Sequence, residues 1–298
     1  MKKNTISQTT VSILLAILAA FSYSLMALSV KLTSDQTTEA MGVFFRFVIS
    51  TSWILAFTIY KKTTGAEIVL KTKNLKINIL RSMFTCLSVL AFFYSIRHTS
   101  LVNANSLMMT YVPLVPLFSF FVWHKKTNVK TWLALFIGFM GVIFILKPQS
   151  AGINFKALAA LIASLSITLS YLAIGFYKKE PAHTIMLYYF PMALILSSVL
   201  VAFNWQTPNS TDTMLLIAAG IAGTIYQEAI TRAMIYTTPS TVSPILYLIV
   251  LFSGLFDQLF WNNRVIDRYF ALGTALIIVG CCVAVYHNSK DCPASLKS

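Results

Sequence analysis

Few ionisable side chains interrupt the long apolar stretches of this sequence, and two of them lie close together. Glu228 and Arg232 are one helical turn apart, so both fall on one helix face and could form an ion pair. An ionisable group in apolar surroundings is costly unless it pairs or faces a cavity, which makes each one a functional candidate. The pair could neutralise itself and fix packing. Alternatively, Glu228 could face a cavity and hold an organic cation or zwitterion, with Arg232 tuning its charge.

Three further charged side chains in the apolar stretches are candidates for an ion pair or a functional role. Arg46 lies early in the second stretch and Asp257 near the end of the ninth. Both should fall toward the outer side of a membrane, where they could form an ion pair or gate, or be solvated at the helix ends. Arg81 opens the third stretch, and we expect its long side chain to reach the membrane interface.

Amide and tyrosine side chains offer uncharged contacts to a polar ligand. Asn103 and Asn105 open the fourth stretch, where they could bind a ligand or form ordinary bonds between helices. Tyrosine rings could hold an organic cation, and we expect two or three of Tyr23, Tyr94, Tyr111, Tyr171, Tyr188, Tyr189, Tyr226 and Tyr247 to do so. The predicted substrate-binding set is Glu228, Arg232, Asn103, Asn105, Tyr94, Tyr226, Tyr247, Gln227 and Tyr188.

The motifs of the common enzyme classes are missing from the sequence. It contains no G-x-S-x-G, no Walker motif and no HExxH, and its histidines do not have metal-ligand spacing. A channel should show a polar ring or filter, and none is evident. We therefore expect no catalytic residue, metal or cofactor. A transporter fits the sequence better than a membrane-embedded enzyme or a channel does.

The elements that must position these residues are ten apolar stretches, each about long enough to cross a bilayer. Backbone in lipid must satisfy its own hydrogen bonds, which favours helices. Hydrophobic residues make up 57% of the chain and charged residues 11%, so the sequence predicts an all-α integral membrane protein. The stretches are Val11 to Val30, Ala40 to Tyr60, Leu75 to Ile96, Leu101 to Trp123, Thr131 to Leu146, Phe155 to Tyr177, Thr184 to Phe203, Met214 to Tyr236, Ser240 to Trp261 and Tyr269 to Tyr286.

The distribution of basic residues predicts the topology. The net charge is +14, but Lys and Arg gather in alternate connections rather than on one face, so nucleic acid is not expected as a partner. Because basic residues mark the cytoplasmic side, both termini and the segment from Lys61 to Asn78 should be cytoplasmic, in the cell inner membrane. The expected contacts are a small-molecule substrate and membrane lipid, and the oligomeric state is not predicted.

The two halves of the chain show a weak internal similarity. Tyr94 to Ala104 can be laid over Ala233 to Ser243 without gaps, and the same register places Gly141 over Gly280. We therefore predict two five-helix repeats, residues 1–150 and 151–298. An odd number of helices reverses the direction of the second copy, which gives the inverted arrangement typical of alternating access.

The repeat and the order of several short motifs indicate a family. The motifs are Phe45-Arg46-Phe47, Arg81, Phe93 to Ser100, Pro113 and Pro116, Tyr226 to Ala233, Thr238 to Tyr247, Gly273 and Gly280. In these features the chain resembles the EamA-type ten-helix branch of the drug/metabolite transporter superfamily over nearly its whole length. One departure is that His124-Lys125 and Asn263-Arg264 stand where many relatives have Gly-Glu, so no role of that Glu is expected here.

The resemblance implies a secondary transporter in which the first four helices of each half enclose a cavity. The fifth and tenth helices would stand outside it, packed closely through Gly138, Gly141, Gly273 and Gly280. The stretch from Gln227 to Tyr247 looks most like S-adenosylmethionine uptake carriers and amino-acid exporters. The expected substrate is thus a small polar or zwitterionic metabolite, such as S-adenosylmethionine or an amino acid; the alternative is export of amino acids or drug-like cations.

Overall fold

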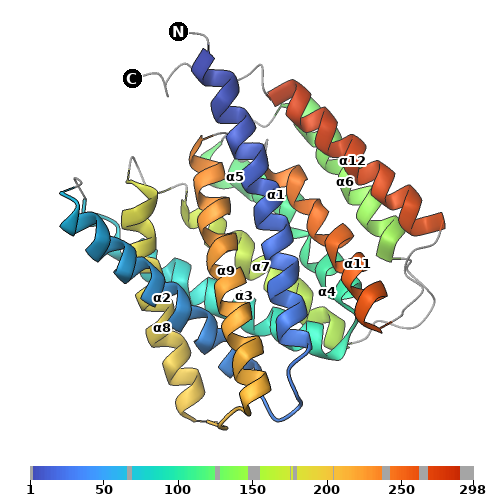
Figure 1. Cartoon of the computed structure of the whole chain (residues 1–298). Helices are drawn as coiled ribbons and strands as arrows, with labels where there is room; N and C mark the ends of the chain where they lie inside the picture. Colours follow the sequence, from blue (N-terminus) through green and yellow to red (C-terminus); the bar gives the residue numbers. More distant parts are fainter. Residues whose placement is uncertain are drawn as a thin grey trace.

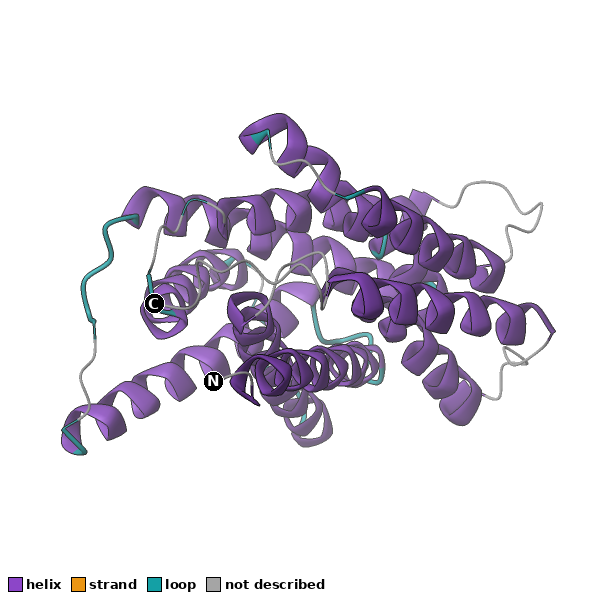
Figure 2. Cartoon of the chain, turned by 90° about the horizontal axis from the view of Figure 1, so that it is seen from above, coloured by secondary structure: helices purple, strands orange, loops and turns teal. Residues whose placement is uncertain are grey.

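The computed structural model describes residues 3–65, 69–124, 128–146, 155–174, 176, 180–203, 205–236, 242–261 and 268–288. Within this part of the chain all regular structure is helical (Figures 1 and 2). The helices are α1 Lys3–Lys31, α2 Glu39–Thr63, α3 Leu75–His98, α4 Leu101–Met108, α5 Tyr111–Trp123, α6 Val129–Leu146, α7 Phe155–Ile174, α8 Ala182–Ala202, α9 Ser210–Tyr236, the 3-10 helix η1 Ser243–Tyr247, α11 Leu248–Trp261 and α12 Arg268–Asn288.

The lengths and apolar character of these helices are those of a multi-pass membrane protein. Seven segments are long and apolar enough to cross a membrane, and α6, α7 and α12 contain shorter apolar helices. Two of the seven segments combine elements, because α4 and α5 form one and η1 and α11 form another. The all-helical membrane fold predicted from the sequence is therefore confirmed.

The helices pack in antiparallel pairs that join distant parts of the chain. The Ser12 hydroxyl, near the start of α1, donates to the Ala233 carbonyl near the end of α9, at 3.2 Å. At the other end of the pair, the Ser34 amide donates to the Asp212 carboxylate at 3.0 Å. Contacts of the same kind pair α2 with α8, α3 with α7, α4 with α11 and α6 with α12. The start of α1 and the end of α12 consequently lie at one end of the bundle (Figure 1).

Proline interrupts two of the spans. Pro113 has no N–H, and its ring would meet the Met109 carbonyl if the α4 helix simply continued. The chain instead makes a tighter turn, in which the Val112 amide donates to Met109 at 3.0 Å, and α5 starts anew at Tyr111. In the other interrupted span Pro244 lies in the first turn of η1.

Glycines bring α6 and α12 together at the edge of the bundle (Figure 1). A Cβ atom at Gly141 would lie 2.6 Å from the Gly273 carbonyl oxygen, and one at Gly280 would lie 2.9 Å from the Gly138 amide nitrogen. Any larger residue would force the helices apart. The predicted close packing of these two helices through their glycines is confirmed.

Candidate functional site

Buried polar side chains from six helices meet in the interior of the bundle. They are Tyr23 of α1, Arg46 of α2, Tyr111 of α5, Tyr171 of α7, Tyr189 of α8 and Tyr226 of α9, and each is at most 6% exposed. We call this set the tyrosine–arginine cluster. Its members come from both halves of the chain, so the fold rather than any local motif assembles it.

Four of the five tyrosines, Tyr23, Tyr226, Tyr171 and Tyr111, form a continuous series of contacts. The hydroxyls of Tyr171 and Tyr226 are hydrogen-bonded to each other. The Tyr226 ring centroid lies 4.8 Å from that of Tyr23, and the Tyr171 centroid lies 5.6 Å from that of Tyr111. Phenol hydroxyls both donate and accept, and ring faces attract cations. The cluster therefore combines polar groups with aromatic faces in the interior of the bundle.

Arg46 contributes the charge of the cluster. Its guanidinium packs against α9 at Gly223, where a Cβ atom would lie 3.1 Å from the Arg46 Nε. It interacts electrostatically with the phenols of Tyr23, Tyr189 and Tyr226. A glycine is thus needed at position 223 to let the guanidinium lie against α9, one turn before Tyr226.

The carboxylates of the described residues do not balance the charge of Arg46. The salt bridges in this part of the chain are Lys31–Asp257, Arg97–Glu39 and Arg232–Glu228, and none includes Arg46. A buried cation that lacks an acidic partner is costly in apolar surroundings. The interior site is accordingly electropositive, and an anionic group of a ligand would relieve that cost.

Arg81 differs from the sequence prediction. It was expected to reach the membrane interface, but its side chain is 1% exposed and its guanidinium carbon lies 4.4 Å from the centroid of the Tyr189 ring. The reason is the rotation of α3, which directs Arg81 toward α8 instead of toward lipid. Arg81 therefore adds a second cation beside the tyrosine–arginine cluster.

The predicted ion pair between Glu228 and Arg232 is present, with 2.7 Å between Oε2 and Nε. The pair lines a pocket, as expected for Glu228, but this pocket is separate from the tyrosine–arginine cluster. Residues two positions apart on an α-helix point in directions about 200° apart, so Glu228 points away from the side of α9 that carries Tyr226. The pair lies in a groove on the outside of the bundle between α1, α2 and α9, lined also by Leu15, Leu18, Ile49, Trp53, Ile221 and Ile225. We call this the lateral groove.

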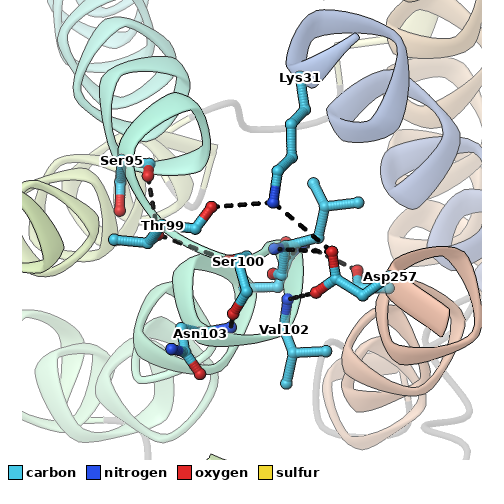
Figure 3. A network of polar contacts seen from close by, with 10 residues as sticks. Lys31, Ser95, Thr99, Ser100, Val102, Asn103 and Asp257 are labelled. Atoms are coloured by element: carbon cyan, nitrogen blue, oxygen red, sulfur yellow. Dashed lines mark hydrogen bonds and ion pairs between the residues drawn. The ribbon is translucent and has the colours of Figure 1, made fainter. Parts of the chain in front are cut away.

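Asp257 is fully buried and has a different partner from the one predicted (Figure 3). Its carboxylate lies 3.5 Å from the Lys31 Nζ and accepts hydrogen bonds from the backbone amides of Leu101 at 3.3 Å and Val102 at 2.9 Å. An Arg46–Asp257 pair is therefore not formed. The carboxylate instead caps the start of α4, where amide groups lack partners within the helix.

The connection between α1 and α2 is held at the same end of the bundle. The Arg97 guanidinium donates to the carbonyls of Ser34 and Thr37, and the Asp212 carboxylate accepts from both hydroxyls. Arg97 also lies 3.6 Å from Glu39. We call these contacts, with Lys31–Asp257, the terminal network. This network was not predicted from the sequence. The features that could have indicated it are the charged residues at the ends of the apolar stretches, next to the Ser- and Thr-rich connection between the first two stretches.

The remaining predicted site residues are spread over the molecule. Asn105 is buried and its Nδ2 donates to the Ser253 hydroxyl at 2.8 Å, which is an ordinary bond between α4 and α11. Asn103 is exposed at the start of α4. Gln227 is buried and its Nε2 lies 3.4 Å from the Thr231 hydroxyl on the same helix.

Among the predicted tyrosines outside the cluster, Tyr247 is buried against Gly138 of α6 and its hydroxyl donates to the Leu135 carbonyl at 3.4 Å. Tyr94 is 39% exposed and packs on His98. Tyr188 is half-buried. Of the predicted substrate-binding set, only Tyr226 therefore lies in the tyrosine–arginine cluster. Arg46 was predicted as part of an ion pair or gate. The other members of the cluster belong to the eight tyrosines of which two or three were expected to hold an organic cation; they are Tyr23, Tyr111, Tyr171 and Tyr189.

Comparison with known proteins identifies the family. The model of the EamA-like transporter family matches residues 10–147 and 152–286. The pseudopaline exporter CntI of Pseudomonas aeruginosa is 27% identical over 282 residues, 93% of this chain and 96% of that protein. The S-adenosylmethionine uptake transporter of Rickettsia prowazekii is 23% identical over 250 residues, 83% of each chain.

One crystal structure has the same fold, with a TM-score of 0.75 at 16% identity over 94% of this chain and 98% of that one. The similarity predicted from the sequence motifs is thus confirmed by the family match. A membrane transporter function, rather than an enzymatic one, follows from the family and from its named relatives. The chain belongs to the EamA-like transporter family.

Proposed function

We propose that this protein is a secondary transporter that moves a small zwitterionic metabolite with a carboxylate group across the inner membrane. The observation that carries the proposal is the buried Arg46, which lacks an acidic partner among the described residues and lies among tyrosines. A guanidinium binds a carboxylate through two parallel hydrogen bonds. The substrate carboxylate would thus take the place of the missing acidic side chain.

The tyrosines suit the other end of such a substrate. An ammonium or sulfonium cation is attracted by the faces of aromatic rings, and Tyr23 and Tyr226 present such rings beside Arg46. S-adenosylmethionine carries a carboxylate, an ammonium group and a sulfonium, and amino acids carry the first two. The uptake carrier of S-adenosylmethionine among the relatives supports this substrate class. A drug-like cation without a carboxylate would leave Arg46 uncompensated, so it fits less well.

The pairing of helices supports two inverted repeats, residues 1–150 and 151–298. The chain has ten spans if α4 with α5 and η1 with α11 are each counted as one. When each span of one half is exchanged for the corresponding span of the other half, five places along the chain, the same set of helix pairs results. The pair of α1 and α9 becomes the pair of α7 and α3, while the other pairs exchange their own members. The two separate matches to the family model agree with this division. Such a pseudo-symmetric bundle is the usual basis of alternating access.

The terminal network supports a closed gate at one end of the bundle. It joins α1, α3, α4, α9 and α11 through charged hydrogen bonds, at the end opposite the start of α1. With both termini in the cytoplasm, as the basic residues indicate, this end faces outward. Opening it would require these bonds to break while the substrate remains bound at the tyrosine–arginine cluster.

Competition in reconstituted vesicles tests the proposal. Purified protein would be reconstituted into proteoliposomes, and saturable uptake of labelled S-adenosylmethionine would be measured against unlabelled methionine, other amino acids and their methyl esters. Because esterification removes the carboxylate, we expect each ester to compete at least about tenfold more weakly than its acid. Esters that compete as well as the acids would contradict a role for Arg46 in binding a carboxylate.

A matched pair of variants identifies the responsible arginine. Arg46→Gln should remove the difference between acid and ester, whereas Arg232→Gln, on the outer face of α9, should retain it. If labelled S-adenosylmethionine is not taken up, the same comparison applies to a labelled amino acid. Uptake that never saturates would instead favour a channel.

A further inference from the structure

The lateral groove is distinct from the tyrosine–arginine cluster because the two lie on opposite sides of α9. Its volume is about 450 Å³, within the range of small-molecule sites. Apolar side chains form its walls, and several of them are strongly exposed: Leu18 is 45%, Trp53 51%, Ile221 48% and Ile225 41% exposed. Such a surface on a membrane protein faces hydrocarbon chains.

The charged pair lies at one end of these apolar walls. Glu228 and Arg232 follow Ile221 and Ile225 on the same face of α9, toward its C-terminal end. From Ile221 to Arg232 the helix rises roughly 16 Å, about half of the ~30 Å hydrocarbon thickness. Arg232 is one turn from the end of α9 at Tyr236. The groove thus runs from near the bilayer centre to one interface, which is the length of a single leaflet.

The Arg232 guanidinium and the Glu228 carboxylate can each bind a further charged group. The Arg232 side chain is 44% exposed. Among the described residues it donates a hydrogen bond to Glu228, and it does so through its Nε. The two Nη groups can therefore donate to an anion. The Glu228 side chain is 15% exposed and its carboxylate has additional lone pairs for a cationic donor. The net charge of the pair is zero, which matches a headgroup that carries one charge of each sign.

From this geometry we propose that the lateral groove is a binding site for one phospholipid with an ethanolamine headgroup. Because the Arg232 guanidinium reaches back to Glu228, its Nη groups can donate to the phosphate beside the carboxylate. The ethanolamine turns back along the headgroup, and its ammonium group donates to the Glu228 carboxylate. One acyl chain lies along Ile225 and Ile221 between α1 and α2. A choline headgroup has no N–H to donate, and a glycerol headgroup brings a negative charge without a positive one, so both fit less well.

Native mass spectrometry of the full-length protein tests this assignment. Protein released from detergent would be titrated separately with phosphatidylethanolamine, phosphatidylcholine and phosphatidylglycerol of identical acyl chains. We expect one tightly retained phosphatidylethanolamine, bound about tenfold more tightly than either other lipid. Equal retention of all three lipids would show only annular contact and overturn the proposal.

Two kinds of variant locate the site. Ile221→Trp should fill the groove and abolish tight binding, while Ile278→Trp on α12 is a control because Ile278 is also 48% exposed. Glu228→Gln should shift the preference to phosphatidylglycerol, because Arg232 is then an unbalanced cation. Unchanged binding to Ile221→Trp, or an unchanged preference in Glu228→Gln, would refute the proposal. Loss of saturable uptake in Ile221→Trp with normal lipid binding would assign the groove to substrate instead and equally refute it.

Discussion

Arg46 and Arg232 have the same type of side chain but lie in different surroundings. Arg46 is 3% exposed, lies among tyrosines and has no salt bridge within the described part of the chain. The Arg232 side chain is 44% exposed and pairs with Glu228 at 2.7 Å. The first is a buried charge that needs a partner, whereas the second already has one. In the two proposals above, the uncompensated charge would bind the substrate and the compensated pair would bind a lipid.

Glu228 is the other intramembrane charge that the sequence made a candidate for substrate binding. An intramembrane carboxylate is a reasonable candidate for binding a cationic substrate, and the sequence contains few such residues. The structure places this carboxylate on the outer face of α9, against an arginine that neutralises it. In the proposed function, the tyrosine rings would bind the cationic end of the substrate, because ring faces attract cations without carrying a charge.

The largest effect is expected from Arg46→Gln. It removes two charge-assisted hydrogen bonds to the substrate carboxylate, each worth about 1.5–3 kcal/mol, so saturable uptake should fall by about 100-fold or more. The folded protein should be as stable as the parent or more stable, because an uncompensated buried charge is removed. Uptake in proteoliposomes and thermal unfolding in detergent measure the two effects. A variant that unfolds more readily would show that Arg46 serves the fold.

Asp257 is a buried charge that has partners, so its replacement should lower the stability of the fold, in contrast to replacement of Arg46. Asp257→Asn removes the carboxylate that pairs with Lys31 and caps α4, so the free energy of unfolding should fall by about 2 kcal/mol. Uptake should decline severalfold because the terminal network loosens. The control is Glu39→Gln, whose side chain is 26% exposed and should matter by less than about 1 kcal/mol. Equal thermal stability of the two variants would contradict a specific role for Asp257.

A smaller change should displace Arg46 without removing it. In Gly223→Ala the new Cβ would lie 3.1 Å from the Arg46 Nε and 3.0 Å from the Met26 Sδ, so the guanidinium must shift by a few tenths of an ångström. We expect KM for uptake to rise about fivefold, because bidentate binding depends on orientation. Gly220→Ala is matched, since its Cβ meets Ile49 at 2.7 Å but not Arg46. If both variants raise KM equally, general packing rather than Arg46 is responsible.

The smallest effect on transport is expected from Glu228→Gln. Its side chain lies on the outer face of α9, so saturable uptake should stay within about twofold of the parent, while the folding free energy falls by no more than about 1 kcal/mol. Uptake and thermal unfolding measure these effects. Loss of uptake by a well-folded Glu228→Gln variant would place the substrate against Glu228 and reverse the comparison with Arg46.

The amino-acid sequence by itself determined the class of structure and several local pairings. The length of the apolar stretches requires membrane helices, because backbone in lipid can satisfy its hydrogen bonds within a helix. The spacing of Glu228 and Arg232 predicted their ion pair, since residues one turn apart meet whatever surrounds them. Gly141 and Gly273 likewise indicated a close helix contact. Each of these depends on neighbours in sequence or on residue size.

The tertiary structure alone decided which face of each helix points inward. A membrane helix is apolar on most of its surface, so its sequence carries only a weak signal for its rotation about its own axis. That rotation turns Tyr226 rather than Glu228 toward the interior, directs Arg81 toward Tyr189, and joins Asp257 to Lys31 rather than to Arg46. Contacts with other helices set it, through small residues and polar bonds between segments far apart in the chain. The partner of a buried charge is therefore a property of the assembled bundle.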